Sequence, residues 1–90
     1  MLKTLEELIN LIRDRKKSSN EDSYTKKLLD DKKLSVAKVK EEIGELIEAV
    51  DNKSNTVHEA ADVLYHLAVY LEANNIHIED VMAELEKRKK

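Results

Sequence analysis

Two pairs of acidic residues stand three positions apart in this chain: Glu42 with Glu45, and Glu59 with Asp62. On a helix, this spacing places both members of a pair on one side of the axis. The second pair borders the most apolar stretch of the sequence, and no Lys or Arg occurs at positions 54–86. Carboxylates that crowd together without a counter-charge either take up protons or bind a cation. The pattern therefore predicts a divalent-metal site, and with it phosphate chemistry.

Five helices are expected to position these acids. Apolar residues at helical spacing predict a first helix that runs to about residue 17, followed by a polar loop to residue 22. Ser23 is the expected cap of a short second helix, and Ser35 the expected cap of the third, which ends in the polar segment 52–55. A fourth helix is predicted over 56–73. After a turn at 74–75, the last helix, predicted over 78–88, should bury three apolar side chains: Val81, Met82 and Leu85.

The third helix has an apolar seam that we take as its buried direction, formed by Val39, Ile43, Leu46 and Val50. Glu42 then lies on the shoulder of this seam, with Glu45 one step further round. Glu41 and Glu48 are expected on the opposite, solvated side. Antiparallel packing of the third helix on the fourth would bring two carboxylates from each helix into one cleft. Hard oxygen ligands of this kind suit Mg²⁺, with Mn²⁺ as an alternative.

The length and composition favour an all-α domain over residues 1–90, a bundle of four to five helices. Pro is absent, and Gly occurs once. The fourth helix is apolar on nearly all sides, and a chain of 90 residues is too short to bury all of these sides by itself. We therefore expect a homodimer that completes the core and leaves Glu59 and Asp62 half-buried. Gly44, in the middle of a helix, suggests close approach by another helix or the ligand.

Charge and residue usage exclude several classes of function. A net charge of −3 disfavours general nucleic-acid binding, and the absence of Cys removes disulfides and thiolate metal sites. The scarcity of His also makes Zn²⁺ a poor fit. The longest stretch free of charged residues, 63–71, is too short to span a membrane. The sequence therefore predicts a soluble, cytoplasmic protein with no membrane partner.

Simpler interpretations exist for some of these residues. Thr56 and Glu59 match a capping box, in which Glu59 only caps its own helix. Lys38 is well placed to pair with Glu41 or Glu42 on the helix surface. His66 is one turn from Asp62, where it is either a donor to that carboxylate or a packing residue.

Four segments in order resemble the phosphoribosyl-ATP pyrophosphohydrolase family, within the MazG-like all-α nucleotide pyrophosphohydrolases. They are SYT at 23–25, KVKEEIGE at 38–45, EAADVLYH at 59–66 and EDVMAEL at 79–85. The resemblance covers nearly the whole chain. It implies a Mg²⁺-dependent dimer that performs the second step of histidine biosynthesis, in which phosphoribosyl-ATP and water give phosphoribosyl-AMP and pyrophosphate.

Carried over by position, the metal ligands implied by this resemblance are Glu42, Glu45, Glu59 and Asp62. A carboxylate that the metal does not saturate, Glu41 or Glu45, is expected to take the proton of the attacking water. Basic groups near the cleft, Lys38 first and Arg15 next, are expected to hold the phosphates of the nucleotide.

Two other functions stay open at this point. One is a housecleaning hydrolase of noncanonical nucleoside triphosphates, with the same metal site and another base specificity. The other is a non-catalytic helical dimerisation module whose acids are merely solvated. The second alternative predicts no stabilisation by Mg²⁺.

Overall fold

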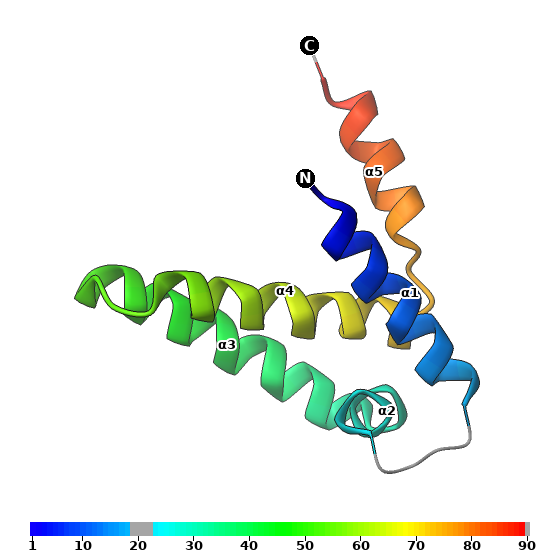
Figure 1. The fold of residues 1–90 in the computed structure, drawn as a ribbon, viewed down its shortest axis with the longest axis horizontal. Coiled ribbons are helices and arrows are strands. Elements are labelled where there is room, and N and C mark those ends of the chain that lie inside the picture. Colours follow the sequence, from blue (N-terminus) through cyan, green and yellow to red (C-terminus); the bar gives the residue numbers. More distant parts are fainter. Residues whose placement is uncertain (19–22, 90) are drawn as a thin grey trace.

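The computed structural model describes residues 1–18 and 23–89, and it contains five helices. These are α1 (Lys3–Lys17), α2 (Tyr24–Asp30), α3 (Lys32–Asn52), α4 (Thr56–Ala73) and α5 (Ile78–Lys87). No strand occurs in these two ranges, which confirms the all-α prediction. α3 and α4 form a long antiparallel hairpin, α2 lies across one end of it, α1 crosses the C-terminal part of α4, and α5 extends away from the hairpin (Figure 1). Within the predicted loop after α1, residues 19–22 lie outside the described part of the chain.

Capping residues decide where α2 and α3 begin. Ser23 caps α2 as predicted, because its hydroxyl accepts a hydrogen bond from the Lys26 N–H at 3.3 Å. The predicted cap of α3 is wrong. Asp31 begins this helix, accepting the Leu34 N–H at 3.1 Å, and Ser35 lies buried one turn inside. A carboxylate at this position satisfies a free N–H group and suits the positive end of the helix dipole.

The apolar core lies at one end of the hairpin, where α1, α2 and α4 meet. Its fully buried side chains are Ile12, Leu28 and Val69, one from each of these helices. Leu34, near the beginning of α3, packs against the same cluster. The half of the hairpin near the α3–α4 link therefore has little apolar support from within its own chain.

The predicted buried seam of α3 is wrong for the single chain. Ile43 and Val50 are 43% and 57% exposed, and the buried side chains of α3 are Ser35, Glu42 and Ala49. Two of these three are small, so they let α4 approach closely. Val39 and Leu46 of the seam are half-buried, and Ile43 and Val50 are left on the outside of the hairpin.

The prediction that α5 buries apolar side chains is also wrong. Met82 and Leu85 are each 50% exposed, Val81 is half-buried, and no residue of α5 is fully buried. The reason is the direction of the helix: α5 leaves the Asn74–Asn75 turn away from the core (Figure 1).

Polar contacts, instead, join α1 to the C-terminal part of α4 and to α5. The Arg13 guanidinium donates to Glu72 at 3.1 Å and to both carboxylate oxygens of Glu79, and it lowers the pKa of Glu79 to about 2. Lys16 donates to the Glu72 carbonyl oxygen and to the side chain of Asn75. Since the Glu72 side chain is only 4% exposed, Arg13 supplies the countercharge of a buried carboxylate.

Arg13→Ala is expected to lower the free energy of unfolding by about 2 kcal/mol, because the buried Glu72 carboxylate loses its charged partner. Urea unfolding followed by circular dichroism measures this loss. Arg88→Ala is the matched control, since it breaks an exposed ion pair with Glu84 and should change little. Adding Glu72→Gln to Arg13→Ala should recover part of the loss. Equal stabilities for the two Arg variants would contradict this role of Arg13.

Candidate active site

The packing of α3 on α4 brings the two predicted acidic pairs together. Glu45 and Glu59 line one pocket of about 290 Å³ beside the α3–α4 link. The Glu42 carboxylate is close enough to Asp62, on the facing helix, for their charges to interact. Carboxylates of the two helices therefore lie near one another, and of the four predicted ligands Glu45 and Glu59 line this pocket.

Glu42 occupies the most unusual environment of these acids. Its side chain is buried, 7% exposed, and its Oε2 atom is shielded from solvent and has no hydrogen-bond partner among the described residues. Burial raises the pKa of Glu42, and the neighbouring carboxylates of Glu45 and Asp62 raise it further. An ionised carboxylate without a partner is costly in such a place. This oxygen is therefore available either to a proton or to a cation.

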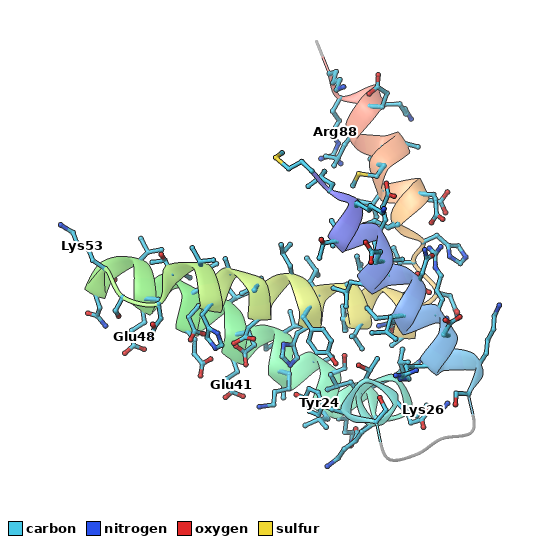
Figure 2. The ribbon with its side chains drawn as sticks, viewed as in Figure 1. Tyr24, Lys26, Glu41, Glu48, Lys53 and Arg88 are labelled. Carbon is cyan, nitrogen blue, oxygen red and sulfur yellow. The ribbon has the colours of Figure 1, made fainter. Side chains whose placement is uncertain are left out.

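Three other acids of α3 differ from their expected placement. Glu45 is exposed instead of lying at the core boundary, and Glu48, predicted to point away, lines the acidic pocket beside it. Glu41, also expected on the far side, offers a carboxylate oxygen within 4.8 Å of oxygens of Glu42 and Glu45. Figure 2 shows Glu41 and Glu48 on the same side of α3. Of the acids of α3, Glu45 and Glu48 line the pocket, while Glu41 lies exposed beside them.

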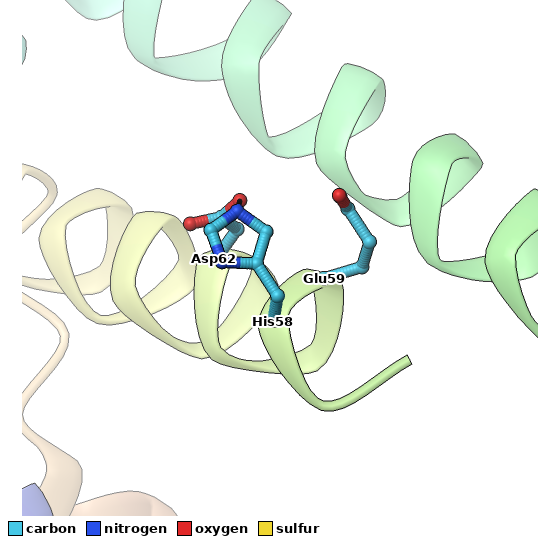
Figure 3. Close-up of side chains that lie close together, drawn as sticks. All are labelled: His58, Glu59 and Asp62. Carbon is cyan, nitrogen blue, oxygen red and sulfur yellow. Dashed lines mark ion pairs between the residues drawn. The ribbon is translucent and has the colours of Figure 1, made fainter. Parts of the chain in front are cut away.

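The capping-box interpretation of Glu59 is wrong. α4 begins after Asn55, which has a left-handed backbone (φ 53°) and makes no side-chain capping bond, so Thr56 lies inside the helix. Glu59 reaches toward α3 instead (Figure 3). Its Oε2 atom is shielded from solvent and, like that of Glu42, has no hydrogen-bond partner.

His66 links the acidic pair of α4 to the SYT segment. Its Nδ1 lies 2.8 Å from the backbone carbonyl oxygen of Asp62, which can only accept, so Nδ1 carries the proton. The other ring nitrogen, Nε2, lies 3.0 Å from the Tyr24 hydroxyl, which donates to it. The Tyr65 ring stacks on Tyr24, and its hydroxyl is hydrogen-bonded to Thr25. His66 is thus a packed histidine that contacts the backbone of Asp62 and not its carboxylate.

The two basic residues expected to hold phosphate lie in different places. Lys38 is on α3 beside the acids, and its Nζ forms a 3.3 Å ion pair with Glu41, which raises the pKa of Lys38. Its charge also acts on the nearby Tyr24. Arg15 is half-buried in the last turn of α1, which packs on α2 and α4. Of the two, only Lys38 is paired with a carboxylate of the acidic cluster within the described residues.

Gly44 does not mark a close approach within this chain. A Cβ atom built on it would meet no atom within 4 Å, so the prediction of a neighbouring helix at this position is not met by the chain's own helices.

Comparison with known proteins shows the family of this chain. Residues 5–89 match the model of the family described as phosphoribosyl-ATP pyrophosphohydrolase. The chain belongs to this family. The phosphoribosyl-ATP pyrophosphatase of Clostridium novyi (strain NT) is 42% identical, over 96% of this chain and 81% of that protein. That of Haloarcula marismortui is 42% identical, over 94% and 92%.

A similar segment also occurs inside a larger relative. The histidine biosynthesis bifunctional protein HisIE of Thermotoga maritima is 42% identical over 93% of this chain, which corresponds to 44% of that protein. The resemblance to the phosphoribosyl-ATP pyrophosphohydrolase family drawn from the four segments is confirmed. In the described part of this family member, no helix combines the length and the apolar character needed to cross a bilayer.

The sequence predicted no place in the site for two side chains that the fold of this pyrophosphohydrolase-family chain puts near the acids. Glu48 lines the pocket, and His58 lies one turn before Asp62, with its Nε2 3.3 Å from Asp62 Oδ2. The spacing of four residues between His58 and Asp62 is the signal that could have indicated this contact, because it places both side chains on one side of α4.

Proposed function

We propose that this chain hydrolyses phosphoribosyl-ATP to phosphoribosyl-AMP and pyrophosphate, the second step of histidine biosynthesis, in the cytoplasm. Family membership supports the substrate. The observation that carries the chemistry is the buried, unpartnered oxygen of Glu42 among three further carboxylates of α3 and α4. With a divalent cation bound between these carboxylates, such a site would suit reactions at the anionic phosphates of a nucleotide.

We propose Mg²⁺, or Mn²⁺ in its place, as the cofactor. The ligands in this proposal are Glu42, Glu45, Glu59 and Asp62. Within the described residues, the Oε2 atoms of Glu42 and Glu59 are shielded from solvent and have no hydrogen-bond partner, which suits the binding of a hard cation. When bound, such a cation neutralises negative charge on phosphate oxygens and acidifies water.

The remaining residues have separate proposed roles. Glu41 or Glu45, both exposed beside the buried Glu42, accepts the proton of the attacking water. Lys38, now paired with Glu41, exchanges this partner for a phosphate oxygen when the nucleotide binds. Arg15, on α1, is assigned the more distant phosphate contact.

Pyrophosphate release from phosphoribosyl-ATP in the presence of Mg²⁺ tests the proposed function. We expect turnover of this substrate to exceed turnover of every member of a panel of nucleoside and deoxynucleoside triphosphates. A preference for one of those triphosphates would assign the chain to housecleaning hydrolysis instead. No release from any of them would leave a non-catalytic module.

We also propose that the protein is a homodimer, formed through the outer faces of the α3–α4 hairpin. Apolar side chains stay exposed along both helices: Ile43, Ile47, Val50, Val57, Leu64 and Leu67. A second copy carries the same apolar face, so a two-fold axis would cover both at once. An apolar surface of this extent on so small a chain is typical of an interface.

Leu64→Glu is expected to convert the dimer to monomers, because it places a charge in the middle of this apolar face. Sedimentation velocity should then give 10.4 kDa for the variant and twice that mass for the wild type. Leu2→Glu, an equally drastic change at an exposed position of the chain before α1, should leave the dimer intact. A monomeric wild type would rule out the dimer.

A further inference from the structure

A histidine lies at the solvent edge of the acidic site. His58 and Asp62 are one helical turn apart on α4, with the His58 Nε2 atom 3.3 Å from Asp62 Oδ2. One ligand atom each from His58, Glu59 and Asp62 lie within 4.8 Å of one another. Figure 3 shows the three side chains on the side of α4 that faces α3. The imidazole is 72% exposed and Asp62 36%, so the histidine is open to solvent while the acids are partly covered.

The ion pair with Asp62 does not by itself account for a histidine at this position. A pair between exposed side chains contributes little to stability. The same site also contains two buried oxygens without a hydrogen-bond partner in the part of the chain that the structure describes. One is on Glu59, and the other is on the buried Glu42, whose charge interacts with that of Asp62. A metal ion bound beside the imidazole nitrogen would satisfy both of these carboxylate oxygens. Histidine with a second ligand four residues along a helix is a familiar metal-binding arrangement.

We propose that His58 is a nitrogen ligand of this site, which raises the affinity of the site for the later first-row dications Co²⁺ and Ni²⁺ while Mg²⁺ is held by the carboxylates alone. The proposal rests on the proposed function, because it uses the same carboxylates. Mg²⁺ prefers oxygen ligands, whereas imidazole binds Mn²⁺ weakly and binds Co²⁺ and Ni²⁺ progressively more tightly. One added nitrogen therefore strengthens binding of the later metals selectively.

Calorimetric titration of the metal-free protein with Co²⁺ and, separately, with Mg²⁺ tests this proposal. The wild type should bind Co²⁺ more tightly than Mg²⁺. His58→Ala should weaken Co²⁺ binding about tenfold or more, which corresponds to about 1.4 kcal/mol, and leave Mg²⁺ binding nearly unchanged. An alanine at an exposed helix position should not disturb folding. His77→Ala, which removes the exposed histidine before α5, is the matched control and should change neither affinity.

A second readout reports ligation directly. With Co²⁺ bound, the ring protons of one histidine should shift far outside the diamagnetic range of the proton NMR spectrum. That signal should vanish in His58→Ala and persist in His77→Ala.

The possible results separate the two proposals. If His58→Ala leaves Co²⁺ binding unchanged, or weakens Co²⁺ and Mg²⁺ binding equally, the nitrogen ligand is refuted while the carboxylate site stands. If the wild type binds neither metal and Mg²⁺ also fails to support turnover, the proposed function fails as well.

Discussion

Glu42→Gln is expected to lower the turnover of phosphoribosyl-ATP by about a thousandfold while leaving the helices intact. The metal contribution to transition-state stabilisation is several kcal/mol, and each 1.4 kcal/mol corresponds to a factor of ten. Gln keeps the shape of the buried side chain but removes the negative charge that holds a cation. The rate constant of pyrophosphate release at saturating substrate and Mg²⁺ measures the loss.

The control for this experiment is a similar change at a distance. Glu84→Gln removes an exposed carboxylate of α5 and should retain wild-type turnover. Asp62→Asn, on the facing helix, should behave like Glu42→Gln. Near-normal pyrophosphate release from either site variant, with unchanged circular dichroism, would refute the assignment of these carboxylates.

Mg²⁺ is expected to reverse the dependence of stability on pH. The pKa of Glu42 is raised in the folded protein above its value in the unfolded chain, about 4.3. In EDTA, the folded state therefore binds more protons than the unfolded state, and Glu42 contributes most to stability below this pH. That contribution is lost as pH rises through the raised pKa. Mg²⁺ binds the ionised carboxylates, so stability should instead rise with pH when the ion is present.

Thermal unfolding at a fixed protein concentration across the range from mildly acidic to neutral pH measures both trends. At neutral pH, free Mg²⁺ at about a hundred times its Kd should add about 2.7 kcal/mol. For a chain of this size, such a gain raises Tm by more than about 10 °C. In Glu42→Gln, the fall of stability in EDTA should be smaller and the response to Mg²⁺ largely absent. Identical curves with EDTA and with Mg²⁺ would support the non-catalytic alternative.

Some elements of this fold are readable from the sequence because polar residues bracket them. The predicted range of the fourth helix, 56–73, agrees with the structure, since Asn-containing segments stand at both of its ends. The beginning of α3 was not predictable in this way. Asp31 and Ser35 are both good caps, and only the packing of Ser35 against the rest of the chain decides between them.

The acidic site was predictable as a meeting of two helices, but not in its orientation. The three-residue spacing within each acidic pair, Glu42 with Glu45 and Glu59 with Asp62, indicates which two helices carry the ligands. The apolar seam of α3 was taken to face the chain's own core, whereas Ile43 and Val50 face outward. Periodicity shows that a helix has an apolar side, but it does not reveal which molecule covers that side. The misplacement of Glu48 follows from the same ambiguity.

The apolar core and the pocket lined by Glu45 and Glu59 lie toward opposite ends of the hairpin, and this has a practical consequence for protein engineering. Side chains around Ile12, Leu28 and Val69 can be exchanged to tune heat resistance without displacing Glu45 or Glu59. Conversely, residues in the half of the hairpin near the α3–α4 link can be substituted without unfolding the core. In a short chain arranged in this way, catalytic activity and thermal stability can evolve through substitutions at different residues.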